Sequence, residues 1–136
     1  MKHLQLIILF TFVSLLSPGQ LLIDPAKLPL VNAAPSVAGV DPKNTISIEY
    51  IFSHGLTITT IDATFRVLQF DVVYDCHSGF LPDFDIRRYQ GNKIEATDKY
   101  LRQRMLTGDV MDIINTVIEK NGVRYRMKPF TFVVTK

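Results

Sequence analysis

The segment Phe65–Cys76 constrains the fold more than any other, because apolar and polar side chains alternate along it for the length of a long strand. Successive side chains of a β-strand point to opposite faces of the sheet, so this alternation is typical of a strand with one face on a core. One face carries Leu68, Phe70, Val72, Tyr74 and Cys76, and the other carries Gln69, Asp71 and Asp75. We therefore expect a long strand here, with Cys76 buried as a small apolar residue.

Further strands are predicted on both sides of that segment. Thr57–Ile61 and Val110–Lys120 are rich in β-branched residues, which favour strands. The pair Asn121-Gly122 is typical of a two-residue hairpin turn, and it connects Val110–Lys120 to a returning strand at Val123–Met127. Phe130–Val134 is expected to form the last strand.

Two short helices are predicted between the strands. Ser47–Gly55 begins with a residue suited to capping a helix and ends with a glycine suited to stopping one. Glu95–Met105 has apolar residues at helical spacing, whereas His77–Tyr89 contains Gly79 and Pro82 and is expected to be irregular. Many strands and few helices together predict an antiparallel β-sandwich of about seven strands, with one or two short helices in its connections.

Residues 1–19 are expected to form a signal peptide. A basic start at Lys2 precedes the thirteen-residue apolar run Leu4–Leu16, and Gly19 marks a cleavage site before Gln20. A helix that spans a bilayer needs about twenty apolar residues, so this run is short for a permanent anchor. The alternatives are a buried first helix and an uncleaved anchor lengthened by Leu21–Ile23.

The rest of the chain is predicted to contain two parts. Residues 20–44 hold several prolines, which remove backbone donors, so we expect an extended lead-in with at most the character of an edge strand. Residues 45–136 are expected to form the sandwich domain, exported and without a stable membrane anchor once the leader is cleaved.

The charge balance excludes one broad class of function. Lys and Arg number 15 and Asp and Glu 13, which gives a net charge of +2. A nucleic-acid-binding domain usually shows a clear basic excess, so we expect no nucleic-acid partner. A single cysteine excludes an intramolecular disulfide, and outside the leader His54 and His77 show no metal-ligand spacing.

Acidic and aromatic residues between positions 71 and 89 offer the chemistry of a binding module. The acidic residues are Asp71, Asp75, Asp83 and Asp85, and the aromatic residues of the loop are Phe80, Phe84 and Tyr89. A calcium site needs about six to eight oxygen ligands, and a third ligand at suitable spacing is missing. A carbohydrate- or calcium-dependent adhesion module is therefore kept as the alternative function. The sequence contains no recognised catalytic or cofactor motif, so we expect neither an enzyme nor a bound cofactor.

Three basic residues follow the hairpin turn at alternate positions. Arg124, Arg126 and Lys128 share one face of the returning strand, and Val123, Tyr125 and Met127 share the other. Such a stripe is either the solvated face of a sheet or a docking surface for an acidic partner. The strand is expected to offer a partner both this charged face and a free edge.

A set of short motifs occurs in one order along residues 25–134. The motifs are Phe65-x-Val67-x-x-Phe70-x-Val72, Gly79-Phe80, Gly91-Asn92-x-Ile94, Leu106-x-Gly108-Asp109, Asp112-Ile113, Asn121-Gly122 and Pro129-Phe130-x-Phe132-x-Val134. Their order and spacing resemble the C-terminal domain of the gliding-motility protein GldM of Bacteroidetes, a component of the type IX secretion system. This resemblance implies an immunoglobulin-like β-sandwich.

The same resemblance implies a non-enzymatic module that binds a protein partner in the periplasm or at the cell surface, and it brings no catalytic or cofactor residues. The family's domain usually opens on a glycine-rich stretch, of which Gly39 is kept here. Members of the family resemble membrane-anchored proteins with several domains, whereas this chain is expected to have a cleavable leader and one domain. Coupling to a membrane motor is therefore not expected.

Overall fold

The computed structural model describes residues 23–33, 35–76 and 83–136, apart from the side chains of residues 75, 76 and 83. The expected leader over 1–19 and the expected burial of the Cys76 side chain lie outside this part. The strands are β1 (Pro35–Val37), β2 (Thr45–Ser47), β3 (Leu56–Thr60), β4 (Arg66–Cys76), β5 (Asp83–Gln90), β6 (Lys93–Ile94), β7 (Val110–Lys120), β8 (Val123–Arg126) and β9 (Phe130–Thr135). The helices are the 3₁₀ turn η1 (Pro25–Lys27), α2 (Ile48–His54) and α3 (Lys99–Arg104).

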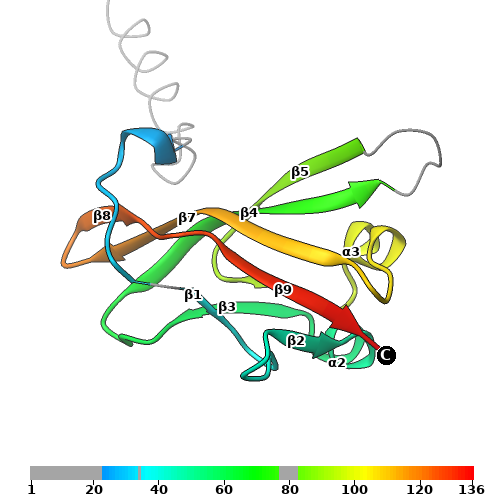
Figure 1. The fold of residues 1–136 in the computed structure, drawn as a ribbon. Helices are drawn as coiled ribbons and strands as arrows, with labels where there is room; N and C mark the ends of the chain where they lie inside the picture. The colour runs from blue at the N-terminus through cyan, green and yellow to red at the C-terminus, as the bar shows by residue number, and fades with distance from the viewer. Residues whose placement is uncertain (1–22, 34, 77–82) are drawn as a thin grey trace, which may run out of the picture.

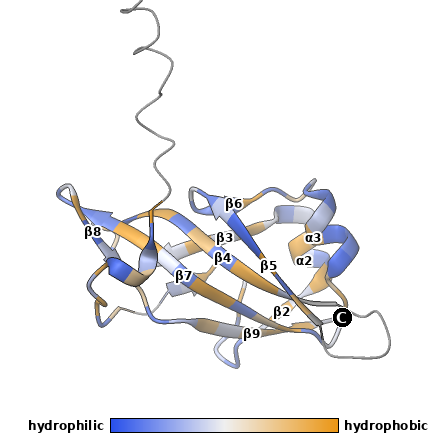
Figure 2. Cartoon of the chain, turned by 90° about the horizontal axis from the view of Figure 1, so that it is seen from above, coloured by the Kyte–Doolittle hydropathy of each residue, from blue (hydrophilic) through white to orange (hydrophobic). Residues whose placement is uncertain are grey.

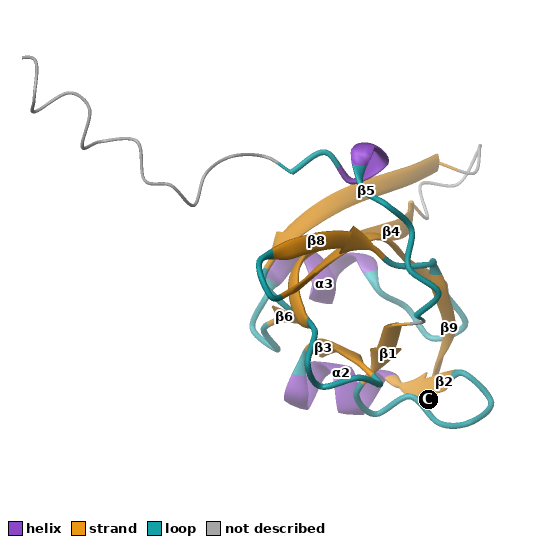
Figure 3. Cartoon of the chain, turned by 90° about the vertical axis from the view of Figure 1, so that its left-hand side faces the viewer, coloured by secondary structure: helices purple, strands orange, loops and turns teal. Residues whose placement is uncertain are grey.

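These strands form two facing sheets, as Figures 1 and 3 show. The large sheet has the order β2-β9-β7-β4-β5, with β8 also paired to β7, and the small sheet has the order β1-β3-β6. The fold is thus the expected β-sandwich. The described part holds nine strands, and the excess over seven comes from strands of two or three residues. The pairing is antiparallel except between β2 and β9, which are parallel.

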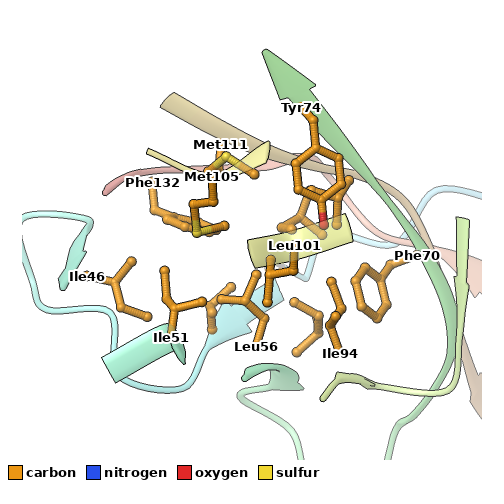
Figure 4. Close-up of a cluster of buried hydrophobic side chains, with 14 of the residues drawn as sticks. Ile46, Ile51, Leu56, Phe70, Tyr74, Ile94, Leu101, Met105, Met111 and Phe132 are labelled. Carbon is orange, nitrogen blue, oxygen red and sulfur yellow. The ribbon is translucent and has the colours of Figure 1, made fainter. Parts of the chain in front are cut away.

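One apolar core fills the space between the sheets and the two α-helices. In β4 the expected face is confirmed for Phe70, Val72 and Tyr74, which are fully buried. Figure 4 shows Phe70 and Tyr74 in one cluster with side chains from β2, α2, α3, β7 and β9, namely Ile46, Ile51, Leu101, Met111 and Phe132. The hydropathy colouring in Figure 2 follows this arrangement, with largely hydrophobic colour along β4 and hydrophilic colour over much of α3.

Local capping signals explain both α-helices. Ser47 Oγ accepts a hydrogen bond from the backbone N–H of Tyr50 at 3.1 Å, and Gly55 ends α2 with a φ of 77°, so the predicted helix is confirmed. The second helix is shorter than the predicted Glu95–Met105. Asp98 caps it by accepting from the N–H of Leu101 at 2.8 Å, and residues 95–98 form a turn instead.

The prediction that His77–Tyr89 is irregular is wrong from Asp83 onward. β5 covers Asp83–Gln90 and pairs along its length with β4, for example Phe70 with Tyr89 and Val73 with Ile86. The proline and the alternating acids suggested a loop, but pairing with the long neighbour β4 supplies the hydrogen bonds that keep this segment extended. Residues 77–82 lie outside the described part.

The proline-rich lead-in belongs to the fold. Its strand β1 lies at the edge of the small sheet, which agrees with the expected edge-strand character. Leu30 forms a parallel bridge with Arg126, so the lead-in also runs beside β8. Among the described residues, no helix combines the length and the apolar character that crossing a membrane requires.

Candidate protein-binding site

The hairpin places the basic stripe on the outer face of the large sheet. Asn121 and Gly122 both adopt positive φ, 52° and 76°, as the tight turn between β7 and β8 requires. Tyr125 points inward, where its ring meets Phe65 edge to face at a centroid distance of 6.0 Å. Because side chains alternate along the strand, Arg124 and Arg126 share the opposite, outer face, as the sequence predicts.

The structure separates Arg124 from the other two basic residues. Arg124 Nε lies 3.5 Å from a carboxylate oxygen of Glu119 on the neighbouring strand. The second oxygen of Glu119 accepts a hydrogen bond from Arg66 of β4 at 2.9 Å. Arg124 therefore has an ionic partner within the molecule, a carboxylate that it shares with Arg66. The sequence gives no signal that Arg66 lies beside the stripe, because only strand pairing brings it there.

Arg126 is half-buried, and both polar groups of its backbone already have hydrogen-bond partners. Its N–H donates to the carbonyl of Pro29 and its carbonyl accepts from the N–H of Val31, both at 2.9 Å. Figure 1 shows the lead-in passing β8 at this point. The prediction of a free β8 edge is therefore wrong at Arg126, because the proline-rich segment occupies that edge.

The side chain of Arg126 contains a buried nitrogen that lacks a hydrogen-bond partner among the described residues. This nitrogen is Nε, an N–H donor. A buried donor without a partner costs free energy, on the order of 1–3 kcal/mol, so this atom favours any ligand that brings an acceptor to it.

Arg126 lines a small cavity of about 240 Å³ together with the third residue of the stripe, Lys128. The other lining residues are Leu30, Ile114, Asn115, Met127 and Pro129. Lys128 is exposed, and its Nζ donates to Asn32 Oδ1 at 2.7 Å. The cavity therefore places two cationic side chains beside apolar walls and an exposed Leu30, a combination that suits a carboxylate group.

A buried ion pair supports one wall of this cavity. Asp71 is 3% exposed, and its carboxylate accepts from Arg88 Nε at 2.8 Å, from Arg88 Nη2 at 3.0 Å and from Asn115 Nδ2 at 2.9 Å. The hydrogen bonds from Arg88 to Asp71 raise the pKa of Arg88. Asn115 has a φ of 52°, in a bulge where β7 has one extra residue opposite β4. The one sequence signal for this site is an asparagine within an apolar strand, since asparagine tolerates positive φ.

The acidic and aromatic candidates whose side chains the structure describes are not gathered into one site. The carboxylate of Asp71 is committed to Arg88 and Asn115, and among the described residues no group of three His, Cys, Asp or Glu side chains could hold a metal. Phe84 and Tyr89 lie on opposite faces of β5, so these two rings do not form one flat platform for a sugar. Asp75, Asp83 and Phe80 have side chains outside the described part.

A larger cavity of about 690 Å³ opens between β3 and β4. Its walls include Ile58, Thr59, Phe65, Arg66 and Asn92. This opening carries a single charged side chain and one aromatic ring, which gives little basis for assigning a ligand.

The fold and this surface define a β-sandwich with a small cationic pocket on the outer face of its large sheet. Comparisons of the chain with protein-family models, with curated proteins and with solved structures give no match. Evidence on function therefore comes from the chemistry of the described residues.

Proposed function

We propose that this chain is a non-enzymatic, exported protein-binding module. The observation that carries the proposal is the buried, unpartnered Nε of Arg126 beside a cavity that Lys128 also lines. An aspartate or glutamate of a partner protein would supply the missing acceptor in a charge-assisted hydrogen bond, which is stronger than a neutral one. Arginine suits this role because its planar fork binds carboxylates with little further ordering.

The resemblance to the C-terminal domain of GldM supports the same class of function. The resemblance implies that the partner is found in the periplasm or at the cell surface, among components of type IX secretion or gliding. The apolar run Leu4–Leu16 followed by Gly19 supports export, and intact-mass measurement of protein from the periplasm should show loss of residues 1–19. A mass that retains Met1 would contradict cleavage of the leader.

The pocket can be tested with a short acidic probe. We expect N-acetyl-Asp-Glu-Asp amide to shift the NMR signals of Arg126, including its Nε–H, and those of Lys128. Arg126→Gln should weaken this binding by about tenfold, because it removes a charge-assisted hydrogen bond. Binding should also weaken as salt is added, since the pocket is partly exposed.

Arg124→Gln is the matched control, two residues away on the same strand. Since Arg124 already pairs with Glu119 and does not line the cavity, this variant should bind the probe nearly as well as the unchanged protein. Equal losses in the two variants would indicate general attraction to the stripe and not a pocket at Arg126. Absence of any shift near Arg126 would overturn the proposal.

A further inference from the structure

β5 is an edge strand of the large sheet. β4 and β7 lie between β5 and β8. Among the described residues β5 pairs only with β4, so its other edge presents unpaired backbone groups (Figure 1). A long exposed edge is a template for pairing with another strand, and folded proteins usually blunt such edges.

The outer face of β5 is unusually apolar for an exposed edge. Phe84 is 61% exposed and Ile86 is 57% exposed, and they lie on the same face of the strand. Val73 of β4 pairs with Ile86 and is half-buried, so the apolar surface continues onto the next strand. Covering these side chains would remove apolar area from water.

β5 carries opposite charges on either side of Ile86, at Asp85 and Arg87, so two antiparallel copies of the strand can pair opposite charges. Antiparallel pairing about a twofold axis keeps each face continuous, so a residue can lie opposite only a residue of its own face. With the axis at Ile86, Asp85 lies opposite Arg87 of a second copy, and Arg87 lies opposite its Asp85. Opposite charges directly across a pair of strands are stabilising, and like charges are destabilising.

Neighbouring positions of the axis set two like charges against each other at the axis itself. An axis at Asp85 places two aspartates opposite each other, and an axis at Arg87 or Arg88 places two arginines opposite each other. With the axis at Ile86, the same alignment sets Ile86 against Ile86 and Phe84 against Arg88 of the second copy. The ring of Phe84 would then contact a guanidinium, which is an attractive pairing.

We infer that β5 is a homodimerisation edge, and that a second copy of this chain pairs with it antiparallel about Ile86. The two large sheets then form one continuous sheet across the dimer. This interface is separate from the pocket at Arg126, so both surfaces are available in one molecule.

A charge-swap experiment on the full chain tests this inference. Analytical ultracentrifugation should show the unchanged protein moving, as concentration rises, toward twice the mass of one chain. Asp85→Arg and Arg87→Asp should each remain monomeric, because each sets two like-charge pairs across the interface. An equimolar mixture of the two variants should recover the dimer mass, because one strand then carries two cations and the other two anions.

Glu95→Arg is the control, with the same change of charge on an exposed residue outside β5, and it should leave the dimer intact. Circular dichroism establishes that each variant is folded, and recovery in the mixture shows that loss of the dimer was not a loss of folding. Protein that stays monomeric at every concentration would overturn the inference, as would variants that still dimerise alone. Failure of the mixture to recover would overturn the register about Ile86.

Discussion

Asp71 is a single carboxylate that organises the outer face of the large sheet. It is nearly completely buried, and removing a carboxylate from water is costly unless its oxygens are paired. Arg88 pairs with it through two parallel hydrogen bonds, and Asn115 supplies a third. Asp71 thereby ties β5 and β7 to β4, and it holds the asparagine that lines the cavity at Arg126.

We expect Asp71→Asn to lower the free energy of unfolding by about 2–3 kcal/mol, because it leaves Arg88 without its counter-charge. Urea denaturation followed by circular dichroism measures this change. Glu95→Gln is the control, since its ion pair with Lys93 is exposed on both sides and is worth at most about 1 kcal/mol. Equal changes in the two variants would show that burial gives the Asp71 pair no special weight.

At the scale of elements, two glycines with nearly the same positive φ lie in different surroundings. Gly55 ends α2 with a φ of 77°, and Gly122 lies in the turn between β7 and β8 with a φ of 76°. A Cβ at Gly122 would meet nothing within 4 Å, whereas a Cβ at Gly55 would approach the carbonyl oxygen of Ile94 in β6. The end of α2 is therefore packed directly against the small sheet.

These surroundings predict different costs for an alanine at the two positions. Gly122→Ala should cost about 1–2 kcal/mol, the penalty of positive φ for a residue with a Cβ. Gly55→Ala should cost clearly more, because the added carbon collides with backbone that cannot move alone. Thermal melting of both variants compares them, and equal losses would contradict the close packing of α2 on β6.

The helices and strands differ in how far the sequence predicts them. The helix α2 and the hairpin turn follow from local signals, namely Ser47, Gly55 and Asn121-Gly122, so their positions could be predicted. β5 could not be predicted, because its extended state depends on pairing with β4 rather than on its own composition.

Only part of the basic stripe and its surroundings can be predicted from the sequence, because the rest depends on contacts between distant segments. Alternation along the strand is local, so the shared face of Arg124 and Arg126 follows from the sequence. Glu119 beside Arg124 and Leu30 beside Arg126 lie on other segments, and only the fold brings them there. The cavity at Arg126 could not be found from spacing alone.

At the scale of the whole molecule, both sheets share a core that contains a fully buried tyrosine. The hydroxyl of Tyr74 lies 2.8 Å from that of Tyr89, and the two can exchange a hydrogen bond. Burial, followed by this hydrogen bond, raises the pKa of Tyr74 far above its usual value of 10, and burial also raises the pKa of Tyr89. The native state therefore keeps protons that an unfolded chain releases.

Stability should consequently be lost under alkaline conditions. Below pH 10 the contribution of Tyr74 is fully present, and as pH rises above 10 each pH unit should remove up to about 1.4 kcal/mol for this one group. Urea denaturation between pH 8 and about pH 11 measures the slope, and Tyr74→Phe should show a smaller slope because it has no proton to lose. A variant with the same slope as the unchanged protein would show that Tyr74 does not govern the alkaline loss.

The position of β9 determines when this domain can acquire its structure during synthesis. β9 is the last strand in chain order, yet it lies inside the large sheet between β2 and β7, and its Phe132 and Val134 are buried in the core. While β9 is still inside the ribosomal exit tunnel, β2 has no partner in the large sheet and the core lacks two of its side chains. We therefore expect stable folding to wait until β9 has emerged, and until then the growing chain should stay in the unfolded state that the proposed export through a membrane channel would require.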